Sequence, residues 1–315
     1  MNDEEVHVVF GAGQVGNALI HRLVSAGRSV RAVSRSRPQS VEAGVEWQVA
    51  DAADPVAAVT AAAGASVVYQ CLGAPYTKWP EQFPPMQRNV IAAAEAAGAL
   101  LVTLENVYGY GPTGGHPMTE DHPLAATTVK GRTRAAMTRD LLLASKAGRV
   151  RIAIGRASDF LGAGATQSAL GERVFANALA GKRADFIGDP DLLHTYSYVP
   201  DIAAGLMILG TDERSIGEVW HLPGPETVTT TALLQMVASE VGHPVGIRSM
   251  PKIVLRGLGI FNPMMRGLAE MRYQFDEPFV LDTSKFESTF GAEPTPLSTA
   301  VAETVAWFRT RTTQP

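Results

Sequence analysis

The stretch from Val6 to Gly16 constrains the fold more than any other part of the chain. An apolar run of strand length, Val6–Phe10, leads directly into Gly11-Ala12-Gly13-Gln14-Val15-Gly16, and a helical pattern begins at Gln14. In such a strand–turn–helix unit the first glycine allows the tight turn, the second lets a pyrophosphate approach the backbone, and the third lets the helix pack closely on the strand. The first turn of the helix adds unpaired N–H groups and the positive end of its dipole. We therefore predict a dinucleotide site formed by Gly11, Gly13, Gln14, Val15 and Gly16, with a purely structural glycine turn as the alternative.

The first half of the chain alternates short apolar strands with helical patterns. Strands are expected at Val6–Phe10, Val30–Ser34, Val45–Val49, Ser66–Leu72, Leu100–Leu104 and Arg149–Ile154, and helices at Asp54–Ala63, Pro85–Ala97 and Thr127–Lys146. This rhythm predicts an α/β fold with a doubly wound parallel sheet of the Rossmann type. Ligands of such sheets bind beyond the carboxyl ends of the strands, so the loops that follow the strands are expected to line one cleft.

After Arg156 the rhythm breaks into shorter elements, with one further strand at Glu218–Leu222 and helices at Thr229–Val241 and Pro294–Arg309. We predict a dinucleotide-binding domain of residues 1–160 plus 197–225. Residues 161–196 plus 226–315 are expected to form a smaller interleaved α/β substrate domain. The apolar stretch Ile253–Arg272 is expected to form a pair of short helices over the cleft, or else the face of a homodimer.

Composition narrows the classes of partner. The 315 residues carry a net charge of −4, which argues against nucleic acid or an anionic membrane as the main partner and leaves a small-molecule substrate. A single cysteine, Cys71, favours a reducing compartment, and the acidic start Met1–Glu5 lacks the features of a signal peptide. The uncharged stretch Val56–Ala74 is expected to form a surface helix and a buried strand rather than a membrane span. A cytoplasmic protein is expected.

The end of the second expected strand indicates which dinucleotide binds. NAD-binding proteins usually place a carboxylate there for the ribose 2′-hydroxyl. This chain has Ser34-Arg35-Ser36-Arg37 instead, and Ser34, Arg35 and Arg37 suit a 2′-phosphate. NADP(H) is therefore favoured over NAD(H), with a solvated basic loop as the alternative. Asp51, after the third strand, is placed to meet the adenine edge, although an ordinary loop carboxylate is an equal reading.

At this point the sequence resembles the extended short-chain dehydrogenase/reductases, the NAD-dependent epimerase/dehydratase family. The resemblance covers nearly the whole chain. Besides the glycines, it rests on these motifs: Asp51-Ala-Ala-Asp54, Cys71-Leu-Gly-Ala74, Arg88-Asn89-Val90, Val107-Tyr-Gly-Tyr-Gly-Pro112, Arg156-Ala-Ser-Asp-Phe-Leu-Gly162, Tyr198-Val-Pro-Asp-Ile-Ala203 and Asp282-Thr-Ser-Lys285 with Trp307. The resemblance implies that Leu72 and Gly73 line the cofactor site and that Asn89 supports it as the fourth member of the family's catalytic tetrad.

The resemblance also implies a Ser or Thr after the fifth strand and a Tyr-x-x-x-Lys pair about 25 residues later. Asn106 stands at the serine position in the best register, and a shifted register places Leu104 there. Lys130 replaces the tyrosine and Arg134 replaces the lysine, so the chain looks like an atypical branch of the family.

These replacements still allow catalysis. Lys130 and Arg134 lie four residues apart on one helix face. If that face meets the cofactor, Arg134 would hold the ribose hydroxyls and Lys130, partly desolvated, would donate a proton near neutral pH. Asn106 would donate an amide hydrogen to a substrate carbonyl. The alternative is a solvated helix face.

Several other polar residues of the expected cleft have alternative roles. Tyr110 is a substitute acid or packs against the smaller domain, and Glu105 neutralises Lys130, acts as a base, or forms a buried structural pair. Tyr108 shares their loop and is assigned to the substrate. Asp159 and His194 occupy positions where relatives that bind sugar nucleotides use Asn and Arg, which weakens diphosphate binding. No metal site is expected.

Three functions follow as hypotheses. The first is an NADP(H)-dependent oxidoreductase that reduces a carbonyl or conjugated-carbonyl group of a small molecule. The second is a sugar-nucleotide epimerase or dehydratase. The third is a non-catalytic protein that senses NADP(H).

Overall fold

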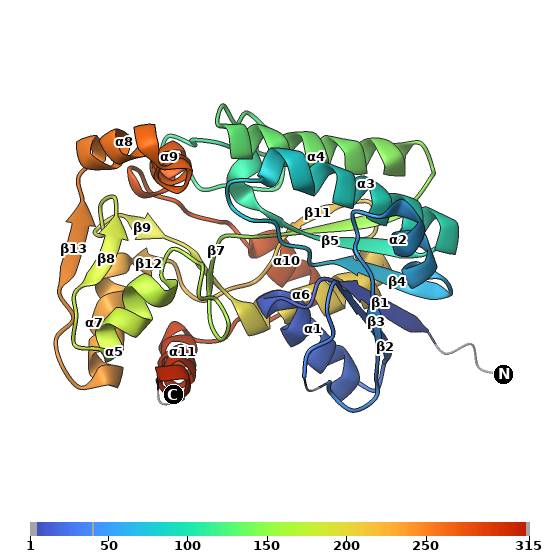
Figure 1. Cartoon of the computed structure of the whole chain (residues 1–315), viewed down its shortest axis with the longest axis horizontal. Helices are drawn as coiled ribbons and strands as arrows, with labels where there is room; N and C mark the ends of the chain where they lie inside the picture. The colour runs from blue at the N-terminus through green and yellow to red at the C-terminus, as the bar shows by residue number, and fades with distance from the viewer. Residues whose placement is uncertain (1–4, 40, 313–315) are drawn as a thin grey trace.

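The computed structural model describes residues 5–39 and 41–312, and its centre is a seven-stranded parallel sheet (Figure 1). The strand order is β11-β6-β5-β4-β1-β2-β3. All neighbours are parallel, and the order in which the chain adds strands changes from one side of β1 to the other between β3 and β4. The strands are β1 (Val6–Phe10), β2 (Ser29–Ser34), β3 (Val45–Val49), β4 (Ala65–Gln70), β5 (Leu100–Asn106), β6 (Arg151–Ala157) and β11 (Val219–His221). The predicted doubly wound Rossmann fold is confirmed.

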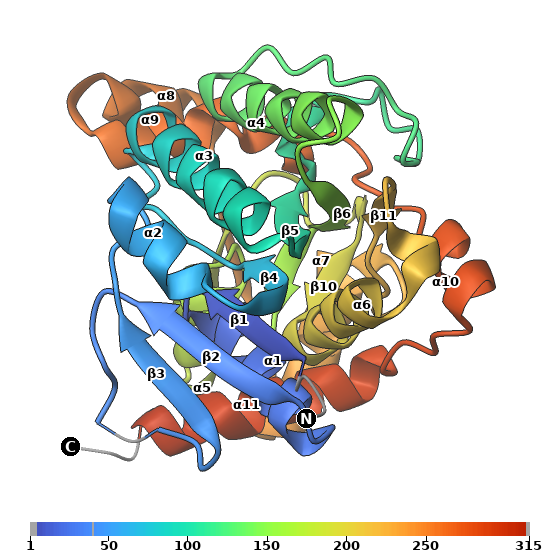
Figure 2. The same cartoon turned by 90° about the vertical axis from the view of Figure 1, so that its right-hand side faces the viewer.

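Helices cover both faces of this sheet, as Figure 2 shows. They are α1 (Gln14–Ser25) and α6 (Val199–Thr211) on one face, and α2 (Pro55–Ala62), α3 (Trp79–Ala97) and α4 (Val129–Lys146) on the other. The sheet is apolar toward both layers, so two hydrophobic cores form. One is shared with α2, α3 and α4, and the other with α1 and α6. Burial on both faces explains why the inner strands β1, β4 and β5 are largely apolar, whereas the edge strand β3 alternates between apolar and polar residues and is only partly buried.

The largest boundary difference is at α3, which begins at Trp79 rather than at the expected Pro85. Pro80 lies in the first turn, where a missing N–H costs little, and Pro84 and Pro85 lie inside the helix. The strand expected at Arg149–Ile154 is β6 and continues to Ala157. The earlier start of α3 matters for the site, because Trp79 and Phe83 line the cavity described below.

A second group of elements packs around its own hydrophobic core. It includes the strands β7 (Asp159–Leu161), β8 (Ala184–Ile187), β9 (Leu193–His194), β10 (Tyr196–Tyr198), β12 (Val228–Thr229) and β13 (Ile247–Met250). Its helices are the π-helical η2 (Gly171–Ala176), α5 (Asn177–Leu179), α7 (Thr230–Val241) and α11 (Leu297–Thr312). The exact division of the chain into two domains stays a prediction.

The stretch Ile253–Arg272 forms two short helices, α8 (Lys252–Phe261) and α9 (Pro263–Glu270), drawn in orange in Figure 1. The remaining short elements are the single turns η1 (Val107–Gly109), η3 (Glu213–Ser215) and η4 (Arg272–Phe275) and the helix α10 (Ser284–Phe290). The side chains of Met264 and Leu268 on α9 line the central cavity described below. The expected position over the cleft is therefore observed for α9, whereas no residue of α8 lines the cavity.

Candidate functional site

The turn after β1 has space for a ligand at one glycine and none at the other two. Gly11 has φ +97°, and a Cβ there would lie 2.5 Å from the Cys71 carbonyl oxygen. A Cβ on Gly16 would lie 1.8 Å from the Gly11 carbonyl oxygen. A Cβ on Gly13 would meet no atom within 4 Å, and Gly13 is the N-cap of α1. The turn thus leaves open space in front of a helix N-terminus, which fits a pyrophosphate.

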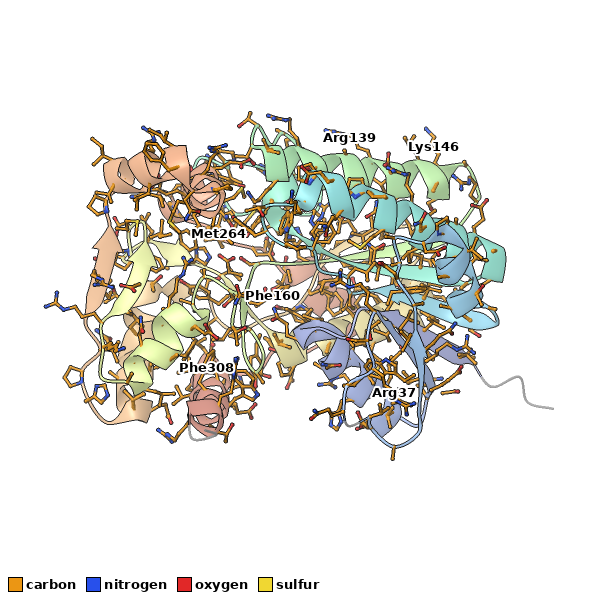
Figure 3. All side chains as sticks on the ribbon, in the orientation of Figure 1. Arg37, Arg139, Lys146, Phe160, Met264 and Phe308 are labelled. Atoms are coloured by element: carbon orange, nitrogen blue, oxygen red, sulfur yellow. The ribbon has the colours of Figure 1, made fainter. Side chains whose placement is uncertain are left out.

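This turn opens into a cavity of about 1040 Å³ at the carboxyl ends of β1 to β6. Fourteen of the predicted site residues line it: Gly11, Gly13, Gln14, Val15, Ser34, Arg35, Asp51, Leu72, Gly73, Glu105, Asn106, Tyr108, Arg134 and Asp159. Six predicted site residues are absent from its wall: Gly16, Arg37, Asn89, Tyr110, Lys130 and His194. Phe160 and Met264, which also line the cavity, lie between the main sheet and the second group of elements (Figure 3).

The loop after β2 brings one of its two arginines to the cavity. Arg35 lines the wall, whereas Arg37 is exposed outside it. The Ser34 hydroxyl donates to the Ser36 carbonyl oxygen over 2.6 Å and so shapes this loop. No carboxylate among residues 34–39 competes with a phosphate.

Asn89 acts on the neighbouring loop rather than on the cavity itself. Its side-chain amide donates to the carbonyl oxygens of Ala52 and Ala53, both over 2.9 Å. Asp51 lines the cavity and accepts from the Ala53 N–H over 2.9 Å. Asn89 therefore fixes the loop that carries Asp51.

At the end of β5, Asn106 faces the cavity. Its side-chain oxygen accepts from the Tyr108 N–H over 3.2 Å and caps η1, which leaves the amide hydrogens to donate. Leu104 lines the cavity too, as does Glu105 between them. Both candidates for the family's serine position therefore meet the cavity.

Glu105 belongs to a buried network. Its carboxylate accepts from the Thr138 hydroxyl over 2.8 and 2.9 Å and pairs with Arg156 over 3.1 Å. Arg156 also donates to the Tyr110 hydroxyl, which lies 2.6 Å from Nε2 of His221. Burial raises the pKa of Tyr110 to about 12 and lowers that of His221 to about 3. Glu105 thus forms the structural pair, and the position of Tyr110 gives no support to an acid role.

Lys130 is not next to Glu105, which corrects the pairing considered above. It is 6% exposed, and its Nζ lies 3.5 Å from the Glu270 carboxylate on α9 and 4.2 Å from the centre of the Tyr76 ring. The Lys130 N–H donates to the same carboxylate over 3.1 Å. The Tyr76 hydroxyl donates to the Gly267 carbonyl oxygen over 3.4 Å. Lys130 therefore joins α4 to α9 and does not face the cavity as expected for a proton donor.

Arg134 lies one turn further along α4 and does line the cavity. Its guanidinium lies over the rings of Phe83 and Trp79, 4.2 and 5.1 Å from their centres. Trp79 in turn stacks on Tyr108 with ring centres 5.7 Å apart. Burial lowers the pKa of Arg134, although an arginine remains protonated at neutral pH.

Asp159 and His194 form a pair at the opposite wall. Nε2 of His194 lies 2.9 Å from the Asp159 carboxylate. The imidazole is buried between aromatic rings, with Phe275 stacked 4.8 Å away. His194 is therefore behind the wall, and Asp159 is the member of the pair that lines the cavity.

Sequence reasoning missed an aromatic and methionine wall. Trp79, Phe83 and Tyr76 come from the start of α3 and the loop before it, a region that was expected to be outside the helix. Other missed residues of the wall are Met264, Leu268, Met271, Gln274, Phe275 and Arg173. The spacing of Met264, Leu268 and Met271 at i, i+4 and i+7 was a usable signal, because it places all three on one helical face.

Residues 7–222 match the NAD dependent epimerase/dehydratase family. The chain belongs to this family. It is thereby an NAD(P)-dependent enzyme of the short-chain dehydrogenase/reductase superfamily, with a nicotinamide cofactor. A curated relative, the dTDP-6-deoxy-L-talose 4-dehydrogenase (NAD(P)(+)) of Kitasatospora kifunensis, is 27% identical over 263 residues, which cover 78% of this chain and 82% of the relative.

Solved structures of family members share the fold. The UDP-glucuronic acid 4-epimerase of Bacillus cereus, in complex with UDP-glucuronic acid and NAD, gives a TM-score of 0.79 at 17% identity and covers 97% of this chain and 99% of its own. The dTDP-glucose 4,6-dehydratase of Bacillus anthracis, in complex with NAD, gives 0.79 at 15% identity, with 97% of each chain covered.

Two negative findings apply to the described part of the chain. No helix within residues 5–39 and 41–312 has the length and apolar character that a membrane crossing needs. In the same residues, no three His, Cys, Asp or Glu side chains gather closely enough to hold a metal ion.

Proposed function

We propose that this enzyme is an NADP(H)-dependent oxidoreductase that reduces a carbonyl or conjugated-carbonyl group of a small molecule. The observation that carries the proposal is that one cavity joins the open glycine turn to the side chains of Asn106 and Tyr108. Cofactor and carbonyl would then meet at the carboxyl edge of the sheet, where doubly wound folds bind their ligands.

The preference for NADP(H) is supported by Arg35. Arg35 lines the cavity beside Ser34 and Ser36, and the loop carries no carboxylate. A guanidinium forms paired, charge-assisted hydrogen bonds with a phosphate. NADH, which lacks the 2′-phosphate, would leave Arg35 without a partner.

The cavity also supplies groups for carbonyl reduction. The Asn106 amide would donate a hydrogen bond to the carbonyl oxygen and orient it. When bound, NADPH supplies a hydride to the carbonyl carbon. The hydroxyl of Tyr108 would give its proton to the oxygen, so that C=O becomes CH–OH. Burial and the Asp159 carboxylate raise the pKa of Tyr108, so its hydroxyl is a weaker acid than a free tyrosine and would give its proton only to the strongly basic alkoxide that hydride transfer creates.

A panel of ketones, aldehydes and enones tests this proposal through NADPH consumption. Tyr108→Phe should lower kcat about 10²- to 10⁴-fold, the usual contribution of a positioned proton donor, with the Kd for NADPH within about twofold of wild type. Tyr110→Phe is the matched control, because Tyr110 is outside the cavity wall, and it should retain kcat. Full activity in Tyr108→Phe, or no turnover of any compound by a protein that binds NADPH, would refute the proposal.

A second candidate is oxidoreduction of a sugar nucleotide at the same site. It is favoured by the 27% identical dTDP-6-deoxy-L-talose 4-dehydrogenase and by Arg173, an exposed guanidinium in the cavity wall that suits a diphosphate. Calorimetric titration of the NADP⁺-bound enzyme with dTDP and UDP sugars tests it. Micromolar binding that Arg173→Gln abolishes would support this candidate, and absence of heat would end it.

A further inference from the structure

Arg134 is a buried cation that forms no ion pair in the described part of the chain. Its side chain is 8% exposed, and its Nε is buried with no hydrogen-bond acceptor. Within residues 5–39 and 41–312, the guanidinium has contacts with the rings of Phe83 and Trp79 but no ion pair. Charges that are taken out of water in this way are normally paired.

The acids nearest in the fold already have partners. Glu105 also attracts the Arg134 guanidinium, but it forms its ion pair with Arg156 over 3.1 Å and accepts from Thr138. One carboxylate thus serves two guanidiniums, and one positive charge is left over. The Asp159 carboxylate lies 2.9 Å from Nε2 of His194. On α9, the carboxylate of Glu270 holds Lys130. Arg134 therefore brings an unbalanced positive charge to the cavity wall, where a ligand can reach it.

The cofactor does not supply the missing charge at this place. The glycine turn that fits the pyrophosphate follows β1, and Arg35, which fits a 2′-phosphate, follows β2. Arg134 is on α4, which contacts α3, β6 and the turn η1 after β5. The ribose hydroxyls that the family likeness assigns to this position are neutral, and a neutral partner leaves the guanidinium charge unbalanced.

We propose that Arg134 binds the carboxylate of the substrate, so that the enzyme reduces a small oxo acid. The planar guanidinium fork matches a carboxylate with two parallel hydrogen bonds. Asn106 and Tyr108 line the same cavity, and Tyr108 stacks on Trp79, the ring beneath the fork. A carboxylate held at Arg134 therefore brings a neighbouring carbonyl toward Asn106. This inference rests on the proposed reductase function and names its substrate class.

The stability of the unligated protein is the first test. Arg134→Met keeps the stem that packs on the aromatic rings and removes the uncompensated charge. A residue placed for a ligand should be replaceable without loss, so Tm should equal or exceed that of wild type. Arg132→Met is the matched control, because Arg132 is exposed on the same helix and is absent from the cavity wall. A clear fall in Tm for Arg134→Met alone would show a structural role and overturn the proposal.

Ligand binding is the second test, with the NADP⁺-saturated enzyme titrated in a calorimeter. The probes are oxamate, malonate and benzoate, each compared with its neutral amide. Wild type and Arg132→Met should bind at least one carboxylate about tenfold or more tightly than its amide, and Arg134→Met should lose that difference. Retention of the difference in Arg134→Met, or absence of carboxylate binding to a wild type that binds NADP⁺, would overturn the inference.

Two outcomes separate this inference from the proposed function. If wild type fails to bind NADP⁺ or NADPH, the proposed function itself is wrong. If the enzyme reduces neutral carbonyl compounds and Arg134→Met raises the Kd for NADP⁺ tenfold, the proposed function stands, and Arg134 binds the cofactor rather than the substrate.

Discussion

Two alanine substitutions in one turn should cost different things: Gly16→Ala mainly stability, and Gly13→Ala mainly cofactor affinity. At Gly16 the added methyl would lie 1.8 Å from the Gly11 carbonyl oxygen, so α1 must move away from β1. Overpacking of this kind costs about 3 kcal/mol, or roughly 6 °C in Tm for a chain of this size. At Gly13 the methyl meets no atom within 4 Å, and φ −80° with ψ −166° suits alanine. The cost there is about 0.5–1 kcal/mol, because alanine is a poorer N-cap than glycine.

Gly13→Ala should instead be the variant with the large loss of cofactor affinity. The Gly13→Ala methyl occupies the space that the pyrophosphate needs, so the Kd for NADPH should rise at least about tenfold, equal to about 1.4 kcal/mol. Chemical unfolding and titration of NADPH fluorescence measure the two quantities on each variant. A Gly13→Ala protein that binds NADPH like wild type, or a Gly16→Ala protein as stable as wild type, would refute this account of the turn.

Three further predictions concern separate parts of the molecule. Arg35→Gln should raise the Kd for NADPH about tenfold or more and leave the Kd for NADH within about twofold. Arg37→Gln, outside the cavity wall, should change neither Kd. Equal losses of affinity for both cofactors on titration would contradict the assignment. Lys130→Met should lower the free energy of unfolding by about 2 kcal/mol, since it leaves the Glu270 carboxylate unpaired. The pH profile of kcat should keep its wild-type shape. Loss of one limb of that profile would identify Lys130 as the proton donor after all. Burial holds the pKa of His221 at about 3, below its ordinary 6.5, so its contribution to stability is present above pH 6.5 and is lost as the pH falls toward 3. From pH 8 to pH 5, His221 should lower the free energy of unfolding by about 2 kcal/mol, as measured by guanidinium unfolding. His221→Gln should remove this difference, and His116→Gln, at an exposed site, should preserve it.

The fold could be predicted because its signals are local. Most strands of the sheet are largely apolar segments of strand length, and the turn after Phe10 contains glycines whose spacing has a steric cause at Gly11 and Gly16. The helix start at Trp79 was missed for a local reason as well. Pro84 and Pro85 suggest an end to a helix, yet α3 continues through both of them.

The partners of the charged side chains could not be predicted in the same way. Lys130 and Arg134 share a helix face, and their spacing alone favours a common role. Only the fold shows that Glu270, 140 residues away in the chain, pairs with Lys130, and that Arg134 has aromatic neighbours instead. Glu105 likewise finds Arg156 across 51 residues. Ion pairs of such separation depend on how α4, α9 and β6 pack together, and no local pattern encodes that.

The central claim is that this cavity transfers a hydride from NADPH to a carbonyl carbon. The most direct measurement incubates the enzyme with NADPH deuterated at the transferred C4 position and a panel of carbonyl compounds that includes oxo acids, followed by mass spectrometry of the products. We predict one deuterium on the former carbonyl carbon of at least one product, and its loss in Tyr108→Phe. Tight binding of NADPH with no deuterium in any product would contradict the claim.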